Sequence, residues 1–121
     1  MSLFPLPHDH GQNSENIISH LPDTGDFQIL SELFRLLSDC SRIRIFWLLC
    51  HCEECVINLS AMMEMSSPAV SHHLRQLKSA GLIISRREGK EVYYKAANTA
   101  TAQGLHDMIE TLMTISCPTK N

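Results

Sequence analysis

The segment from Ser66 to Ile83 constrains the fold of this chain more than any other. Ser67 is a favourable N-cap, and Pro68 suits the first position of a helix, where the N–H that proline lacks would have no partner within the helix. Gly81 is expected to end the helix, because glycine is the residue that most often adopts the left-handed conformation found just after a helix. The apolar residues between these signals recur at i, i+4 and i+7 and are Val70, Leu74 and Leu77. The segment therefore predicts a short amphipathic helix with one buried stripe.

The face opposite this stripe is small, polar and cationic. An advance of about 100° per residue places on it Pro68, Ser71, His72, Arg75 and Ser79. Arginine and serine side chains on such a face can reach base edges and phosphates in the major groove of DNA. His73 falls beside the apolar stripe instead, so we expect it to support the helix through hydrogen bonds rather than to bind a ligand.

A basic hairpin is predicted directly after this helix. Residues 82–87 and 91–95 are rich in strand formers, and Glu88-Gly89-Lys90 between them is typical of a hairpin loop. The cations near the tip are Arg86, Arg87 and Lys90. A recognition helix followed by a cationic hairpin predicts a winged helix-turn-helix whose wing contacts backbone phosphates.

Charge is distributed unevenly along the 121 residues, which carry a formal net charge of −3. Residues 67–95 hold six Lys or Arg against two Glu, whereas residues 1–66 hold nine acidic side chains against three Arg. The basic segment favours DNA as a partner despite the negative total. Because the sequence shows no membrane-span candidate and no signal-peptide pattern, we expect a cytoplasmic protein with its five cysteines free or bound to metal.

The rest of the chain predicts an arm and four further helices. Residues 1–25 contain several prolines and glycines, which favours a flexible arm that carries histidines and one helical turn near residues 15–20. Residues 26–117 are expected to form the winged domain, whose fold class is mainly α with a small β-hairpin and about five to six helices. Ser38 and Asp39 are expected to cap the second helix. The further helices are expected at residues 26–37, 41–51, 56–65 and 99–116.

The first and last of these helices carry apolar stripes. The side chains expected to be buried on the first are Phe27, Leu30, Leu33, Phe34 and Leu37. The stripe on the last consists of Leu105, Met108, Ile109, Leu112 and Ile115. Since the wing already closes the core, we expect the last helix to pair with its copy in a homodimer, packing against its own domain being the alternative. Such a dimer would set two recognition helices about 34 Å apart on a palindrome.

Three motifs in this order resemble the ArsR/SmtB family. Residues 36–45, LLSDCSRIRI, are similar to its L(A/S)DPTRLRIL signature, and residues 66–77 are similar to its recognition helix. Residues 86–94 resemble its R-x-G-(K/R)-x-x-x-Y wing. The resemblance covers about residues 30–95 and implies a dimeric winged repressor that releases operator DNA when it senses an effector.

The cysteine-rich segment 50–55 is the candidate effector site. Thiolates and imidazoles suit Zn(II), Cd(II) and other thiophilic metals. Many metal-sensing relatives carry E-x-C-V-C-D-(L/I) here, and Cys55 matches the first cysteine of that motif, while Ile57 and Asn58 replace the second cysteine and the acid. The relatives' Cys-x-Cys site is therefore not transferred, and Cys52 is expected to supply the missing thiolate. Cys50 either joins the site or is a buried core thiol.

Two further segments carry residues of the metal-ligand type. His8 and His10 in the arm either complete the cysteine site, as arm ligands do in some relatives, or belong to a solvated tail. The terminal helix is a known family location for Asp-x-His and His-x-x-Glu pairs. The spacing of the family pairs is not found here among His106, Asp107 and Glu110, and Asn98 occupies the position of the acidic ligand. We therefore expect no metal site there.

The sequence thus predicts a DNA-binding repressor that is released from double-stranded operator DNA by Zn(II) or Cd(II). The residues expected to contact DNA are Ser66, Ser67, Ala69, Ser71, His72, Arg75, Gln76, Arg86, Arg87 and Lys90. Those expected to bind metal are Cys52, Cys55, Cys50, His8 and His10. A repressor of the same fold that senses oxidants or persulfides through cysteine pairs is the alternative. An enzyme is not expected, because the chain has no spare domain for a substrate cleft.

Overall fold

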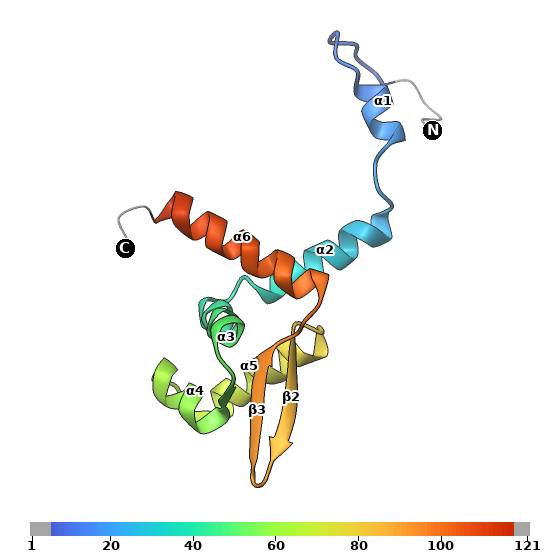
Figure 1. Cartoon of the computed structure of the whole chain (residues 1–121). Coiled ribbons are helices and arrows are strands. Elements are labelled where there is room, and N and C mark those ends of the chain that lie inside the picture. The colour runs from blue at the N-terminus through green and yellow to red at the C-terminus, as the bar shows by residue number, and fades with distance from the viewer. Residues whose placement is uncertain (1–5, 118–121) are drawn as a thin grey trace. The chain divides into compact units, whose positions relative to one another are not determined.

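The computed structural model describes residues 6–117, which are drawn in colour in Figure 1. The chain divides into two units between Glu32 and Leu33. The first five residues of the predicted arm lie outside the described part. The elements in chain order are α1 (Ser14–Ser19), α2 (Thr24–Leu36), α3 (Cys40–His51), β1 (Glu54–Cys55), α4 (Val56–Met63), α5 (Ser67–Ser79), β2 (Ile83–Glu88), β3 (Glu91–Ala96) and α6 (Ala100–Ser116). The winged helix-turn-helix expected from the sequence is confirmed.

Three helices, α3, α5 and α6, begin at side chains that cap them. Asp39 accepts a hydrogen bond from the backbone N–H of Arg42 at the start of α3, and Thr99 accepts one from Ala102 at the start of α6. The predicted cap of α5 was wrong by one residue, because Ser66 is the N-cap and Ser67 is already helical. The end of α5 is as predicted: Gly81 has a φ of 78°, and the N–H of Leu82 bonds to the carbonyl of Leu77.

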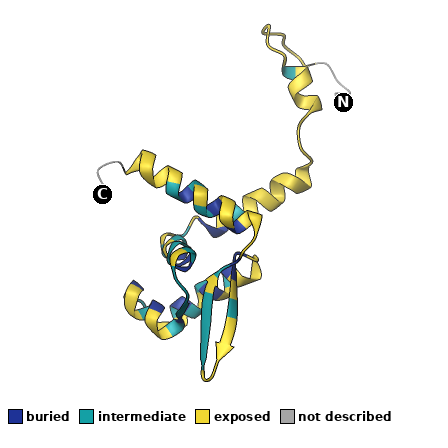
Figure 2. Ribbon diagram, viewed as in Figure 1, coloured by how far each residue is buried: buried dark blue, intermediate teal, exposed yellow. Residues whose placement is uncertain are grey.

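The core lies where α3 packs against α4, α5 and β3. The predicted stripe of α5 is fully buried, and α4 contributes Leu59 and Met63. Ile45, Phe46 and Leu49 of α3 are almost completely inaccessible, which confirms the central place expected for this helix. Leu105 and Ile109 of α6 are buried and belong to this core. Figure 2 shows buried stretches of α6 in dark blue.

The wing is part of a three-stranded antiparallel sheet with strand order β1-β3-β2. The hairpin closes tightly, because Glu88 pairs with Glu91 across a loop of Gly89 and Lys90. Gly89 has a φ of 64° at the first loop position, which a type II′ turn reserves for glycine. The short strand β1 was not predicted, since two residues leave no alternation to detect; it places Glu54 and Cys55 beside Tyr94 and Tyr93.

The apolar stripe of α2 is less buried than predicted. Phe27, Leu30 and Phe34 are 44–50% exposed, and of the expected set only Leu37, just beyond the helix, is buried. Towards the end of α6, Leu112, Met113 and Ile115 are also exposed. The sequence pattern identifies apolar side chains but does not show what covers them.

Replacing Asp39 by alanine is expected to lower the free energy of unfolding by about 1 kcal/mol, the usual contribution of an N-cap. The backbone N–H of Arg42 lowers the pKa of Asp39. The contribution is therefore complete above the ordinary aspartate pKa of about 3.9 and is lost as the pH falls through the lower pKa of the folded state. Urea denaturation at a series of pH values measures it, with the exposed Asp26→Ala as control. A difference between Asp39→Ala and the parent chain that stays constant into strong acid would contradict this role.

Candidate DNA-binding surface and metal centre

The α5 surface that the sequence assigns to DNA is accessible at its centre. His72 and Arg75 are exposed on the face opposite the buried stripe, and Ser71 is half-buried beside them. At the amino-terminal end of the helix, Ser66 and Ser67 are exposed and Ala69 is half-buried. This arrangement leaves one long cation and several short polar groups directed outward, as the helical spacing predicts.

Gln76 and His73 are held by the buried Arg42 of α3. The guanidinium group of Arg42 donates to Gln76 Oε1 at 2.6 Å, lies 3.5 Å from His73 Nδ1, and also donates to the backbone carbonyl of Leu36. His73 Nε2 lies 4.0 Å from Asp39. The supporting role predicted for His73 is confirmed, whereas the role of Arg42, which ties the end of α2 to α5, was missed.

Arg86 in the wing has three partners in its own chain. Its guanidinium makes two hydrogen bonds to Glu53, of 2.8 and 2.9 Å, and one of 3.0 Å to Glu88, and it lies 4.9 Å above the ring centre of Tyr93. The hydrogen bond from Arg86 lowers the pKa of Glu53. Arg86 therefore fastens the wing to the segment before β1, and its contact with DNA stays a prediction.

Two other wing cations are available to an anionic partner. Arg87 follows Arg86 on the strand and therefore points to the other face of the sheet, and Lys90 lies in the turn. Within residues 6–117 both are exposed and neither has an ion-pair partner. Near the start of the wing, Lys78 of α5 donates to Ser85 at 2.6 Å.

The cysteines of segment 50–55 lie at the end of α3 and the start of α4 without forming a cluster. Cys55 is buried, and Cys52 donates from its thiol to the carbonyl of Leu48 at 3.2 Å. Burial raises the pKa of the Cys50 thiol to about 11, with a contribution from the charge of Glu110, and burial also raises the pKa of Cys52. All five cysteines are free thiols, and sensing through cysteine pairs stays the alternative prediction.

His8 and His10 belong to the amino-terminal unit. Both are exposed, and their rings stack with centroids 5.8 Å apart. Among residues 6–117, neither these histidines nor the cysteines belong to a group of three closely spaced metal-ligand atoms. Their assignment as metal ligands stays a prediction.

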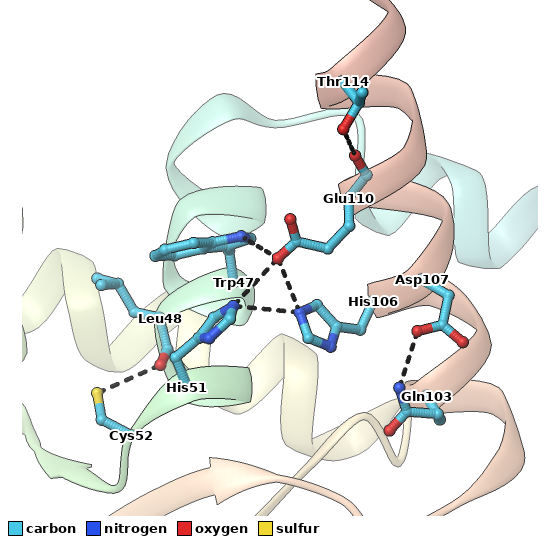
Figure 3. A network of polar contacts seen from close by, with 9 residues as sticks. All are labelled: Trp47, Leu48, His51, Cys52, Gln103, His106, Asp107, Glu110 and Thr114. Carbon is cyan, nitrogen blue, oxygen red and sulfur yellow. Dashed lines mark hydrogen bonds and ion pairs between the residues drawn. The ribbon is translucent and has the colours of Figure 1, made fainter. Parts of the chain in front are cut away.

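His51, His106 and Glu110 do form such a group (Figure 3). His51 is the last residue of α3, and the other two lie one turn apart on α6. The two Nε2 atoms lie 3.2 Å from each other and 3.2 and 3.1 Å from Glu110 Oε1. Trp47 Nε1 donates to the same oxygen at 3.0 Å. We call His51, His106 and Glu110 the triad.

Sequence reasoning missed the triad because it considered the terminal helix alone. The signal was present as two i, i+4 pairs, Trp47 with His51 and His106 with Glu110, but their meeting depends on the packing of α6 against α3. The hydrogen bonds from His51 and His106 lower the pKa of Glu110, so this carboxyl is ionised over a wide pH range.

Comparison with known proteins agrees with this architecture. Residues 39–85 match the family model that is described as bacterial regulatory protein, arsR family. The chain is 37% identical over 98 residues to a transcriptional repressor SmtB homolog of Synechocystis, with 81% of this chain and 74% of the relative covered. It is 38% identical over 74 residues to the cadmium resistance transcriptional regulatory protein CadC of Listeria innocua, with 60% and 62% covered.

A solved structure extends the comparison to the fold. The homodimeric winged helix-turn-helix DNA-binding domain Mb0332 of Mycobacterium bovis has a TM-score of 0.65 at 26% identity, and covers 76% of this chain and 86% of that chain. No helix in residues 6–117 is both long and apolar enough to cross a membrane. The family and these relatives consist of transcriptional regulators rather than enzymes. The chain belongs to the arsR family of bacterial regulatory proteins.

Proposed function

We propose that this chain is a transcriptional repressor that binds operator DNA as a homodimer and releases it when a metal ion binds. The observation that carries the proposal is the exposed polar face of α5 next to the wing. Two cations of this wing, Arg87 and Lys90, have no ion-pair partner among the described residues. The exposure and length of Arg75 support a contact with base edges, whereas the wing cations suit phosphates. Operator DNA in the cytoplasm is the corresponding partner.

The exposed apolar faces support a homodimer. Leu112, Met113 and Ile115 on α6, together with the stripe of α2, are large side chains that a second copy of the chain would remove from water. A two-fold dimer would match the two halves of a palindrome. The solved relative Mb0332 is named as homodimeric, which agrees with this arrangement.

A metal effector is supported by the similarity to the cadmium resistance transcriptional regulatory protein CadC. Zn(II) and Cd(II) are the metals proposed for this chain. A metal that binds one state of the dimer more tightly than the other shifts the population toward that state, and a coupling of about 1–3 kcal/mol weakens DNA binding by about 5–150-fold. The sequence-based ligand set of Cys50, Cys52 and Cys55 with His8 and His10 stays one candidate for the site.

The proposal predicts binding to a palindromic duplex that depends steeply on salt. If Lys78, Arg87 and Lys90 each contact a phosphate in both protomers, the logarithm of the association constant should fall against the logarithm of salt concentration with a slope of about −5. Fluorescence anisotropy with palindromic promoter fragments and with shuffled duplexes of equal length measures this slope and the sequence preference. Equal affinity for all duplexes, in reduced and chelator-treated protein, would contradict a repressor function.

A further inference from the structure

The triad has the dimensions of a metal site before any ion is considered. Its three ligand atoms form a nearly equilateral triangle with sides of 3.1, 3.2 and 3.2 Å. In a tetrahedral zinc site with bonds of about 2.0–2.1 Å, ligand atoms lie about 3.3 Å apart. A zinc-sized ion can therefore bind all three atoms with shifts of a few tenths of an ångström.

Hydrogen bonds within this triangle compete with one another. Glu110 Oε1 is an acceptor, so both Nε2 atoms can donate to it only as N–H groups. Two N–H groups that converge on one oxygen oppose each other across the 3.2 Å between the nitrogen atoms. If the Nε2 atom of either histidine carries no proton instead, its lone pair faces the Glu110 Oε1 atom with no hydrogen between the two atoms. A cation between the three atoms would use one lone pair from each of them, which removes both conflicts.

The surroundings of the triad orient its ligands. Trp47 donates to the same carboxylate oxygen, and its ring lies against His51 with centroids 4.2 Å apart. The rings of His51 and His106 meet edge to face at 4.9 Å. The carboxyl end of α3, where His51 stands, also carries the partial negative charge that favours a cation. Outer contacts of this kind fix ligands in protein metal sites.

We propose that His51, His106 and Glu110 bind one divalent ion of the zinc type within a single subunit, and that this ion is the effector of the repressor. Two imidazoles and a carboxylate suit Zn(II), Co(II) or Ni(II) and do not suit soft, thiol-seeking ions. Three protein ligands leave a fourth position for water. The regulatory half of this inference rests on the proposed function, whereas the site itself does not.

The ion would connect the end of α3 to the middle of α6. α3 packs directly against α5, and α6 carries exposed apolar side chains proposed for the dimer interface. A metal bond between α3 and α6 would therefore fix the recognition helices relative to the dimer axis. This geometry gives the ion a route to alter the spacing between the two copies of α5 on DNA.

Titration of the metal-free full chain with Co(II), followed by displacement with Zn(II), tests the site. We expect one ion per chain and the visible absorption of tetrahedral Co(II). Loss of an outer-shell partner commonly weakens metal binding by about 10–100-fold, so Glu110→Gln and His106→Gln, which remove ligands, should weaken it at least about 100-fold. Glu110→Gln keeps an oxygen that accepts from Trp47, and circular dichroism checks that each variant is folded.

Matched controls separate the triad from other candidates. Asp107→Asn changes a neighbouring exposed acid on α6, and His20→Gln changes an exposed histidine; both should bind the ion as the parent chain does. A variant with serine at Cys50, Cys52 and Cys55 should also bind the ion. X-ray absorption of the metal-bound parent chain should show nitrogen and oxygen neighbours and no sulfur shell at about 2.3 Å. Binding that survives His106→Gln and fails in the cysteine variant would overturn the assignment, as would the absence of any binding.

The regulatory half has its own readout. Zn(II) should release operator DNA from the parent chain and not from His106→Gln, while metal-free DNA affinity should be the same for both. Release that persists in His106→Gln would overturn the role of the triad as effector site. DNA binding by the metal-free chain is measured separately, so failure of the triad and failure of the proposed function are distinguishable.

Discussion

Replacing Arg42 by methionine is expected to lower the free energy of unfolding by about 2–4 kcal/mol, since hydrogen bonds of charged groups contribute about 1.5–3 kcal/mol each and buried acceptors left unpaired add a further penalty. Arg42 is 8% exposed and donates to Gln76 Oε1 and to the carbonyl of Leu36. Methionine preserves the apolar stem and provides no donor. Urea denaturation at one fixed protein concentration measures the change.

Arg44 supplies the matched control, because it lies two residues along α3 and is exposed. Arg44→Met should change the free energy of unfolding by no more than about 0.5 kcal/mol. If the loss in Arg42→Met arises through Gln76, the cost of Arg42→Met should be smaller in a Gln76→Ala background, as a double-mutant cycle would show. Equal effects of Arg42→Met and Arg44→Met would contradict the structural role of Arg42.

Replacing Arg75 by alanine is expected to reduce operator affinity by about 2–6 kcal/mol. A good arginine contact to a base contributes about 1–3 kcal/mol, and a dimer on a palindrome makes two such contacts. Because the contact is made to bases, the loss of affinity should be greatest on the palindromic duplex, and the preference over a shuffled duplex should shrink. Anisotropy titrations on both duplexes measure the two affinities.

Lys90→Ala distinguishes base contacts from phosphate contacts. Removing a wing cation that binds a phosphate should weaken binding to all duplexes about equally, and should reduce the slope against salt by about one for each phosphate that is no longer neutralised. Arg44→Ala, a loss of charge outside α5 and the wing, should leave affinity nearly unchanged. If Arg75→Ala behaved like Arg44→Ala, α5 would not be the element that reads the operator.

The sequence was sufficient where the structure depends on local signals. Gly81 and the 3.6-residue spacing of Val70, Leu74 and Leu77 act within α5, so they predicted the recognition helix almost to its ends. The cap at Asp39 likewise predicted the start of α3. The hairpin was predicted at the right place but with a loop one residue too long, because Glu88 still pairs with Glu91 and the turn consists of Gly89 and Lys90 alone. The resemblance to a known family then predicted how these elements pack together.

Features that depend on packing between distant elements were not predictable. The bonds of Arg42 to α5, of Glu53 to Arg86 and of His51 to Glu110 join residues 33 to 59 positions apart. No local spacing encodes such pairs. The cysteines of segment 50–55 were predicted to form a metal site because they are close in sequence, although in the structure they do not form a cluster. The exposure of the α2 stripe could not be predicted either, because the spacing of apolar residues does not show what covers them.

The most direct test of the central claim is NMR mapping of the reduced, metal-free protein titrated with a palindromic operator duplex. The largest amide shifts are expected in the first half of α5, from Ser66 to Arg75, and in the wing around Gly89 and Lys90. The amides of α6 should move little. Shifts concentrated on α6 or α2, with α5 and the wing unaffected, would show that this protein does not bind DNA through its winged helix-turn-helix surface.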